Sequence, residues 1–291
     1  MVRANETISN TGLVMKDLKF AGLIFHHVKA NSIFIGDDRG GWIYASQRPK
    51  HEVRCPDFFI TENPVNLTEL SAILGVELSP GDETTWNKER LSAIISLLNE
   101  GLSDHVTTLD GDWEVRCPTQ SEWIQAKKSG KISPKSGSKE ILADAVSSNY
   151  RGAMMDGRPR KFDGHGPMKW HVATMEVHPN NNSIHALSSA PMDRDCRDLS
   201  LRLVITPVRK EPAIIVPKRA DYGANIRSEL LWTTILGVVP SFAIPWLRGL
   251  GDYVYSGWVN LLFGGLCVGF VTGAFWRPKR PVIMFEDGVR Q

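Results

Sequence analysis

The stretch RCPTQSEWIQA, residues 116–126, carries the clearest structural signal in the sequence. Thr119 and Glu122 have the spacing of a helix capping box. In such a box the threonine side chain accepts from the backbone N–H three residues on, and the glutamate side chain reaches back to the threonine N–H. The pattern predicts a short helix that begins after Thr119. It also places Trp123 one turn into that helix, facing the core.

Extended segments and two further helices are predicted around this helix. Runs of β-branched and aromatic residues within 23–35, 53–60 and 199–208 indicate strands. Helices are expected to begin near Asn66 and near Asn87, and Gly101 is the expected end of the second. The remaining large segment, Asn149 to Ala190, is rich in Gly, Pro, Asn and His. It shows little periodicity, and we expect surface loops there.

The composition is that of an ordinary globular protein. The chain has 291 residues, of which 42% are apolar and 23% charged, and this excludes disordered and collagen-like classes. Its 34 basic and 32 acidic residues leave a net charge of +2, so nucleic acid is not an expected partner. The four cysteines lie far apart without a CxxC pattern, and neither a zinc ribbon nor a thioredoxin-like site is indicated.

The C-terminal third contains two runs without any charged residue, 230–247 and 256–276. As helices they would be roughly 27 and 31 Å long, which matches the hydrocarbon thickness of a bilayer. Tryptophans lie near the ends of both runs, where indole rings favour the headgroup zone. The alternative is a pair of buried core helices, but those normally keep a polar stripe. The sequence therefore predicts a helical hairpin in a membrane.

Basic residues near the two runs set the expected orientation. They are Lys218, Arg219, Arg227, Arg277, Lys279 and Arg280 outside the hairpin and only Arg248 in its loop. Because basic residues concentrate on the cytoplasmic side, both termini and the main domain are expected in the cytoplasm.

Glycines at every fourth position mark one face of the second run. Gly265, Gly269 and Gly273 would let another helix approach closely, either the first run or a second copy of the chain. The alternative is that glycine is simply common in membrane helices. Pro240 and Pro245 are expected to kink or break the first run. Neither run contains an ionisable residue, which argues against an ion-coupled transporter. A pore built from several copies of the chain is an alternative interpretation of the hairpin.

Four segments, taken in order, resemble the formylglycine-generating enzyme (sulfatase-modifying factor) family, a variant of the C-type lectin fold. They are RPKHEV at 48–53 with FFITENPVN at 58–66, the helix over 86–98, RCPTQSEWIQA at 116–126, and LRLV at 201–204. The resemblance implies an α+β, C-type lectin-like domain followed by the transmembrane hairpin. The expected division is an N-terminal extension (1–20), this domain (21–208), a linker (209–229), the hairpin (230–276) and a cytoplasmic tail (277–291).

The chain departs from the family where the family carries its chemistry. The enzyme has a cysteine pair that binds copper, whereas this chain has only Cys196 in the corresponding region. A copper(I) site needs two thiolates, so no cofactor is expected. If the chain were an enzyme, Cys196 and His171 would be the candidates for catalysis. The weak candidates for a metal site are His165, His171, His178 and His185. Their spacing matches no compact ligand motif, and solvated loop histidines are the alternative.

These observations favour a membrane-anchored, non-catalytic binding or sensing protein. It would recognise a protein or a small ligand with the loops between Asn149 and Ala190. The candidate ligand-binding residues are Arg158, Arg160, Lys161, His165, His171, Asn181 and Arg194. The basic group at 158–161 would also suit an anionic ligand or lipid headgroups. The expected partners are the bilayer, through 230–247 and 256–276, and a protein or a second copy of the chain. The alternatives are a divergent metal-dependent oxidase or oxygenase of the same family and a structural subunit of a membrane complex.

Overall fold

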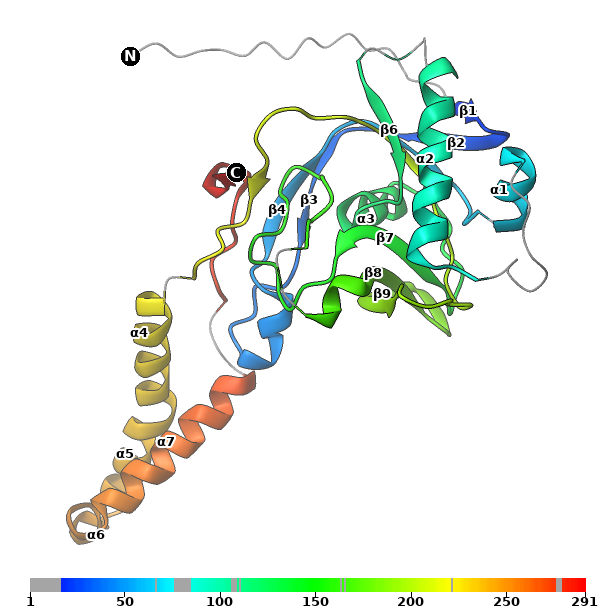
Figure 1. Cartoon of the computed structure of the whole chain (residues 1–291). Coiled ribbons are helices and arrows are strands. Elements are labelled where there is room, and N and C mark those ends of the chain that lie inside the picture. Colours follow the sequence, from blue (N-terminus) through cyan, green and yellow to red (C-terminus); the bar gives the residue numbers. More distant parts are fainter. Residues whose placement is uncertain are drawn as a thin grey trace, which may run out of the picture.

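The computed structural model describes residues 17–65, 67–75, 85–105, 109, 111–162, 164, 166–220, 222–275 and 279–291. The described residues between 17 and 220, together with 279–291, form a body of curved strands and helices, here called the head. Residues 222–275 form a helical hairpin that projects from one end of the head (Figure 1). The head encloses clusters of apolar side chains, whereas many apolar side chains of the hairpin are exposed.

A five-stranded antiparallel sheet runs through the centre of the head. Its order is β1 (Leu18–Phe20), β2 (Leu23–Val28), β5 (Phe58–Thr61), β10 (Val204–Pro207) and β6 (Trp113–Arg116). Every residue of β5 is buried, because successive side chains of a strand point to opposite faces and both faces are covered. Phe59 packs into one apolar cluster, while Phe58 and Ile60 pack into another.

Two helices, α1 (Leu67–Leu74) and α2 (Lys88–His105), contribute to the first cluster. Ile94 and Leu98 of α2 pack there at the period expected from the sequence. The prediction that Gly101 ends this helix was wrong, since α2 continues to His105. Leu102 explains the difference, because the additional turn buries its side chain in the cluster.

The second cluster lies around α3 (Gln120–Lys128). This helix contacts the paired strands β3 (Asn31–Ile35) and β4 (His51–Cys55), and also β7 (Lys139–Ala145) (Figure 1). The predicted capping box is confirmed. The Thr119 side chain accepts from the Glu122 N–H at 3.3 Å, and the Glu122 carboxylate accepts from the Thr119 N–H at 2.8 Å. Trp123 is fully buried, as its position predicts.

The segment expected to be loops is in part a β-hairpin. Residues 171–191 form β8 (His171–His178) and β9 (Asn181–Pro191), which pair with β7 in a three-stranded sheet. The expectation of loops there was wrong. In β8, Ala173, Met175 and Val177 point to one face of the sheet and are buried in the second cluster, while Val172 on the other face packs against the first cluster. The residues just before β8 form the short helical turn η2 (Pro167–Trp170).

The segments expected to be a linker and a tail also pack against the head. The strand β11 (Ile214–Ile215) pairs with β12 (Val289–Arg290), which follows the turn η4 (Phe285–Asp287). A third apolar cluster forms beside them, with Met155 and Val216 fully buried. These short strands are stabilised because the apolar residues 214–216 pack into this third cluster.

The hairpin contains two helices long and apolar enough to cross a membrane. The first, Tyr222–Leu247, comprises α4 (Tyr222–Thr233), the π-helical turn η3 (Thr234–Val238) and α5 (Val239–Leu247). After α6 (Gly251–Ser256), the second is α7 (Trp258–Phe275). The first helix does not break at its prolines. The wider turn of η3 ends two residues before Pro240, whose backbone nitrogen has no hydrogen to donate to the carbonyl of Leu236.

Candidate functional site

The residues that resemble the enzyme family form buried ion pairs in the head. Both nitrogens at the tip of Arg116 donate to Glu122, at 2.7 and 2.8 Å. Burial alone would lower the pKa of Arg116, but the charge of Glu122 and its hydrogen bonds outweigh it and raise the pKa. The guanidinium therefore stays charged, and the pair joins β6 to the start of α3.

A second buried network surrounds Glu140 of β7. Its carboxylate accepts from Trp123 Nε1 at 2.7 Å and from Arg202 Nε and Nη2 at 2.7 and 2.8 Å. Arg202 also donates to the carbonyls of Thr61 and Glu62. Both charged side chains are completely buried, so every one of these bonds is needed to offset their desolvation. The family-like residues thus hold strands and helix together.

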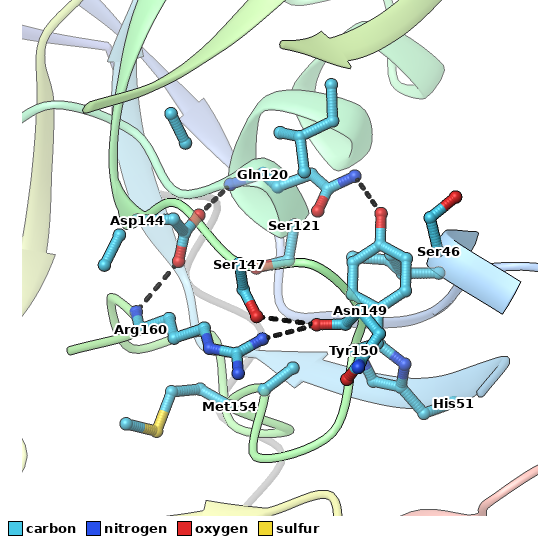
Figure 2. A pocket seen from close by; sticks show the side chains of 15 residues that line it. Ser46, His51, Gln120, Ser121, Asp144, Ser147, Asn149, Tyr150, Met154 and Arg160 are labelled. Atoms are coloured by element: carbon cyan, nitrogen blue, oxygen red, sulfur yellow. Dashed lines mark hydrogen bonds between the residues drawn. The ribbon is translucent and has the colours of Figure 1, made fainter. Parts of the chain in front are cut away.

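A small polar recess lies where the end of β7 meets the first turn of α3 (Figure 2). We call it the Asp144 recess. Its polar lining residues are Ser46, His51, Gln120, Ser121, Asp144, Ser147, Asn149, Tyr150 and Arg160. Its volume of about 60 Å³ suits a few waters or the end of one side chain.

Asp144 organises this recess. Its carboxylate accepts from the Gln120 N–H at 2.7 Å and from the Arg160 N–H at 2.8 Å (Figure 2). The Arg160 guanidinium in turn donates to the carbonyls of Asn149 and Arg151. Asp144 therefore fastens the loop that follows β7 to the start of α3. Burial raises the pKa of Asp144, against the effect of the two N–H donors.

His51 and Tyr150 form the floor of the recess. Their rings lie 5.2 Å apart, and the Tyr150 hydroxyl accepts from Gln120 Nε2 at 2.8 Å. Burial lowers the pKa of His51 to about 4, so its imidazole is neutral at physiological pH. Its Nδ1 lies 3.0 Å from the Pro49 carbonyl oxygen. Because that oxygen can only accept, Nδ1 carries the single proton of the neutral ring and donates it. Burial likewise raises the pKa of Tyr150.

Two serine hydroxyls in the lining of the recess bond to neighbouring groups of the loop and the helix start. Ser147 donates to the Asn149 carbonyl, and Ser121 shares a hydrogen bond with Thr119. Within the described residues, no serine hydroxyl bonds to His51 or Asp144, as an activated nucleophile would require. The recess offers hydroxyl, amide and carboxylate groups that could hold one polar side chain.

The candidate ligand-binding residues are spread over several elements. Arg158 pairs with Asp156 at 2.7 Å and donates to the Glu211 carbonyl. Arg160 lines the Asp144 recess, while Lys161 is exposed. The other members lie as follows: His171 begins β8, Asn181 begins β9, Arg194 is exposed after β9, and His165 lies outside the described residues.

The clustered histidines of the sequence are separated by β8 and β9. His171 and His178 lie at opposite ends of β8, roughly 23 Å apart for an extended strand. The His185 ring lies tilted against Trp123, with the ring centroids 5.0 Å apart, and its Nδ1 lies 3.1 Å from Lys127 Nζ. Burial and that ammonium group lower the pKa of His185. Among the described residues, no group of three or more His, Cys, Asp or Glu side chains could hold a metal ion.

Cys196 lies on the segment after β9. Its half-buried thiol donates to the Pro191 carbonyl at 2.9 Å, and its backbone pairs with Trp86. Cys55 and Cys117 are buried elsewhere in the head, and burial raises the pKa of each thiol to about 12. Cys267 is exposed on α7. All four cysteines are free.

Two glycines of α7 face the first helix of the hairpin. Gly265 and Gly269 are buried against η3 and the end of α4. A Cβ added to Gly265 would lie 2.8 Å from the Val238 Cα, and one added to Gly269 would lie 3.1 Å from the Thr233 Cα. Gly273, one turn further on, is also buried.

Sequence reasoning missed the centre of the recess. Asp144 and Tyr150 belong to no local motif, and they meet only because β7 ends beside the first turn of α3. His51 and Gln120 stand in the family-like segments but were not singled out for a site. The available local signal was a single aspartate near the end of the apolar run ILADA at 141–145.

No family model matches the sequence, and no curated protein matches it either. Several solved structures are distantly similar to the chain, including the following two. The structure of PvdO from Pseudomonas aeruginosa has 13% sequence identity and a TM-score of 0.49, and the match covers 67% of this chain and 98% of that one. The Treponema denticola variable protein 1 has 14% identity and a TM-score of 0.40, with 66% and 99% covered.

Proposed function

We propose that this protein is a membrane-anchored, non-catalytic binding protein. The observation that carries the proposal is the apolar surface of the hairpin. The most apolar 18-residue windows of its two long helices have mean hydropathies of 1.6 and 1.7, and only 6% and 22% of these windows are buried. Leu247, Phe263 and Phe270 are each more than 60% exposed. A lipid bilayer would cover this surface, and a water-soluble hairpin would leave it uncovered.

We propose further that the head is a formylglycine-generating-enzyme-type, C-type lectin-like domain without the enzyme's activity. The family-like residues Arg116, Glu122 and Arg202 support this, because all three hold the fold through buried ion pairs. The chemistry of the family needs a thiol pair. Cys196 has its thiol bonded to a backbone carbonyl, and this arrangement supports a structural role.

The partner is proposed to be a protein that inserts one polar side chain into the Asp144 recess. The small volume of the recess favours a side chain over a free metabolite, because ligand pockets usually exceed about 300 Å³. The neighbouring loop is attached to the rigid start of α3 through Asp144, and recognition sites commonly consist of loops on a rigid scaffold.

The head is proposed to face the cytoplasm. The chain leaves the head before the hairpin and returns to it afterwards, because β12, which follows the hairpin, pairs with β11, which precedes it. Both ends of the hairpin therefore lie on the same side. The basic residues of the flanks, including Lys218, Arg219 and Lys279, lie on that side. Such residues favour the cytoplasmic face.

Photocrosslinking in native membranes tests the binding role. A photoreactive residue would replace Ser148, which is exposed at the rim of the recess, or Ser96, which is exposed on α2 as the matched control. The proposal predicts a discrete crosslinked protein from position 148 and none from position 96. Identical products from both positions, or none from either, would contradict it. A stoichiometric metal in native mass spectrometry of the full chain would favour the oxidase alternative.

A further inference from the structure

A second, larger cavity lies at the junction between the head and the hairpin. Its volume is about 890 Å³, within the range of small-molecule sites. Four segments line it: residues 45–49 of the head, the loop at 149–151, the chain from 218 into the start of α4, and residues 279–283 after α7. Figure 1 shows that the end of α7 reaches the head, while the chain that leads into α4 descends from it.

The charge of this junction cavity is strongly unbalanced. Its lining contains five basic residues, Arg48, Arg151, Lys218, Lys279 and Arg280, and no acidic one among the described residues. Arg280 pairs with Glu229 at 2.7 Å, and Lys279 lies 3.6 Å from Asp38. These two acidic side chains balance only part of the positive charge.

Two guanidinium groups have backbone partners instead of carboxylates. Arg48 donates to the Gly40 carbonyl at 3.1 Å, and Arg151 donates to the Pro217 carbonyl at 3.3 Å. Neither bonds to a carboxylate within the described part of the chain. Burial, together with the nearby charge of Arg280, lowers the pKa of Arg48, which still remains protonated. Each guanidinium has five N–H groups, and most of these stay available for an anion.

The position of the cavity fits the headgroup layer of a membrane. The uncharged run of the first helix begins at Leu230, and Asn225 in the cavity wall lies roughly 7 Å before it along the helix. Lipid headgroups occupy about 5–7 Å on each side of the hydrocarbon core. The first turn of α4, including Tyr222 and Ala224, also lines the cavity, and its backbone N–H groups add positive potential.

We infer that the junction cavity binds the phosphate of one anionic phospholipid through Arg48 and Arg151. Guanidinium groups suit phosphate because their paired N–H donors match its oxygens. A lipid fits better than free phosphate because the same cavity is also lined by Ala220, Tyr222 and Ile283, which could contact the glycerol and the beginning of the chains. This inference rests on the proposed membrane anchor.

Native mass spectrometry of the full chain tests it, after reconstitution in nanodiscs of equal parts phosphatidylglycerol and phosphatidylcholine. We expect one phosphatidylglycerol to remain bound when the nanodisc is removed. The double variant Arg48→Gln/Arg151→Gln should retain roughly tenfold less, because two charge-assisted contacts are lost. The variant Arg48→Lys/Arg151→Lys, which keeps the charge but not the fork geometry, should fall between the two.

The matched control is Arg219→Gln/Arg227→Gln. It removes the same charge from exposed residues of the same flank that do not line the cavity. Equal loss of lipid in the control would overturn the site in favour of general surface attraction. So would equal retention of phosphatidylcholine, or displacement of the lipid by millimolar inorganic phosphate. Release of the chain from membranes by alkaline carbonate would instead overturn the anchor, so the two failures are distinguishable.

Discussion

The head and the hairpin of this chain reach a packed state in opposite ways. The head buries charged groups, and Arg202 and Glu140 are completely removed from solvent. The hairpin has no charged residue over 230–247 or 256–276 and leaves its apolar side chains exposed. Its helices meet instead through glycine at positions such as Gly265 and Gly269. The comparison shows two kinds of packing: the head combines apolar clusters with buried, paired charges, whereas the hairpin relies on close backbone contact between apolar helices, whose exposed surface the proposed bilayer would cover.

The largest effect is expected from the buried ion pairs of the head. Glu140→Ala leaves Arg202 charged and buried without its partner, and we expect a loss of about 3–5 kcal/mol in the free energy of unfolding. Glu176→Ala is the matched control, since its pair with Lys139 is exposed and contributes about 1 kcal/mol or less. Denaturant titration of the full chain in detergent measures both. Equal losses would contradict the role assigned to burial.

The next effect is a pH dependence confined to the head. The pKa of His51 is about 4 in the folded chain, against an ordinary value of 6.5, because burial disfavours the charged form. As the pH falls, His51 therefore binds its proton at a higher pH in the unfolded chain than in the folded chain. Above pH 6.5 the neutral His51 contributes fully to the free energy of unfolding. This contribution, roughly 3 kcal/mol, is lost as the pH falls toward 4. Thermal unfolding at several pH values measures it.

His51→Asn tests the assignment, because the asparagine amide can still donate to the Pro49 carbonyl but does not titrate. The variant should show a flatter pH dependence between pH 6.5 and 4. A pH dependence identical to that of the unmodified chain would show that other groups cause it.

A smaller effect is expected from the glycine contact of the hairpin. Gly265→Ala would place a methyl group 2.8 Å from the Val238 Cα, and the helices should separate at a cost of about 1–3 kcal/mol. Gly264→Ala has nothing within 4 Å of its added Cβ and should be neutral or slightly stabilising. Hydrogen exchange over 234–247 and 258–275 reports the opening. Faster exchange in both variants would mean that helix contact is not the cause.

The smallest effect concerns Cys196. Serine at this position keeps a donor for the Pro191 carbonyl, and we expect a change in stability of about 1 kcal/mol or less. The crosslink formed from position 148 should also persist in Cys196→Ser. A loss of the crosslink with unchanged stability would give the thiol a functional role and support the oxidase alternative.

Local motifs made much of the fold predictable, whereas long-range contacts did not show in the sequence. The Thr119 capping box and the apolar period of α2 depend on residues within one or two turns. The pairing of β11 with β12 joins residues about 75 positions apart, and two-residue strands have no visible period. In β8, the alternation at Ala173, Met175 and Val177 was obscured by the flanking histidines and asparagines.

The candidate site was less predictable than the fold for the same reason. The basic and histidine residues chosen from the sequence lie on separate elements, because proximity in sequence does not bring side chains together across a strand. The Asp144 recess and the junction cavity combine segments from distant parts of the chain. Each needs the tertiary fold before its members become neighbours.

The central claim, that the hairpin lies in lipid while the head lies in water, is tested most directly with a spin label on Cys267. This cysteine is exposed on α7, whereas Cys55 and Cys117 are buried, so Cys196→Ser leaves one reactive thiol. Electron paramagnetic resonance in proteoliposomes then compares collisions with oxygen, which concentrates in lipid, and with a water-soluble nickel chelate. The account predicts high accessibility to oxygen and almost none to nickel. High accessibility to nickel at Cys267 would place the hairpin in water and contradict the account.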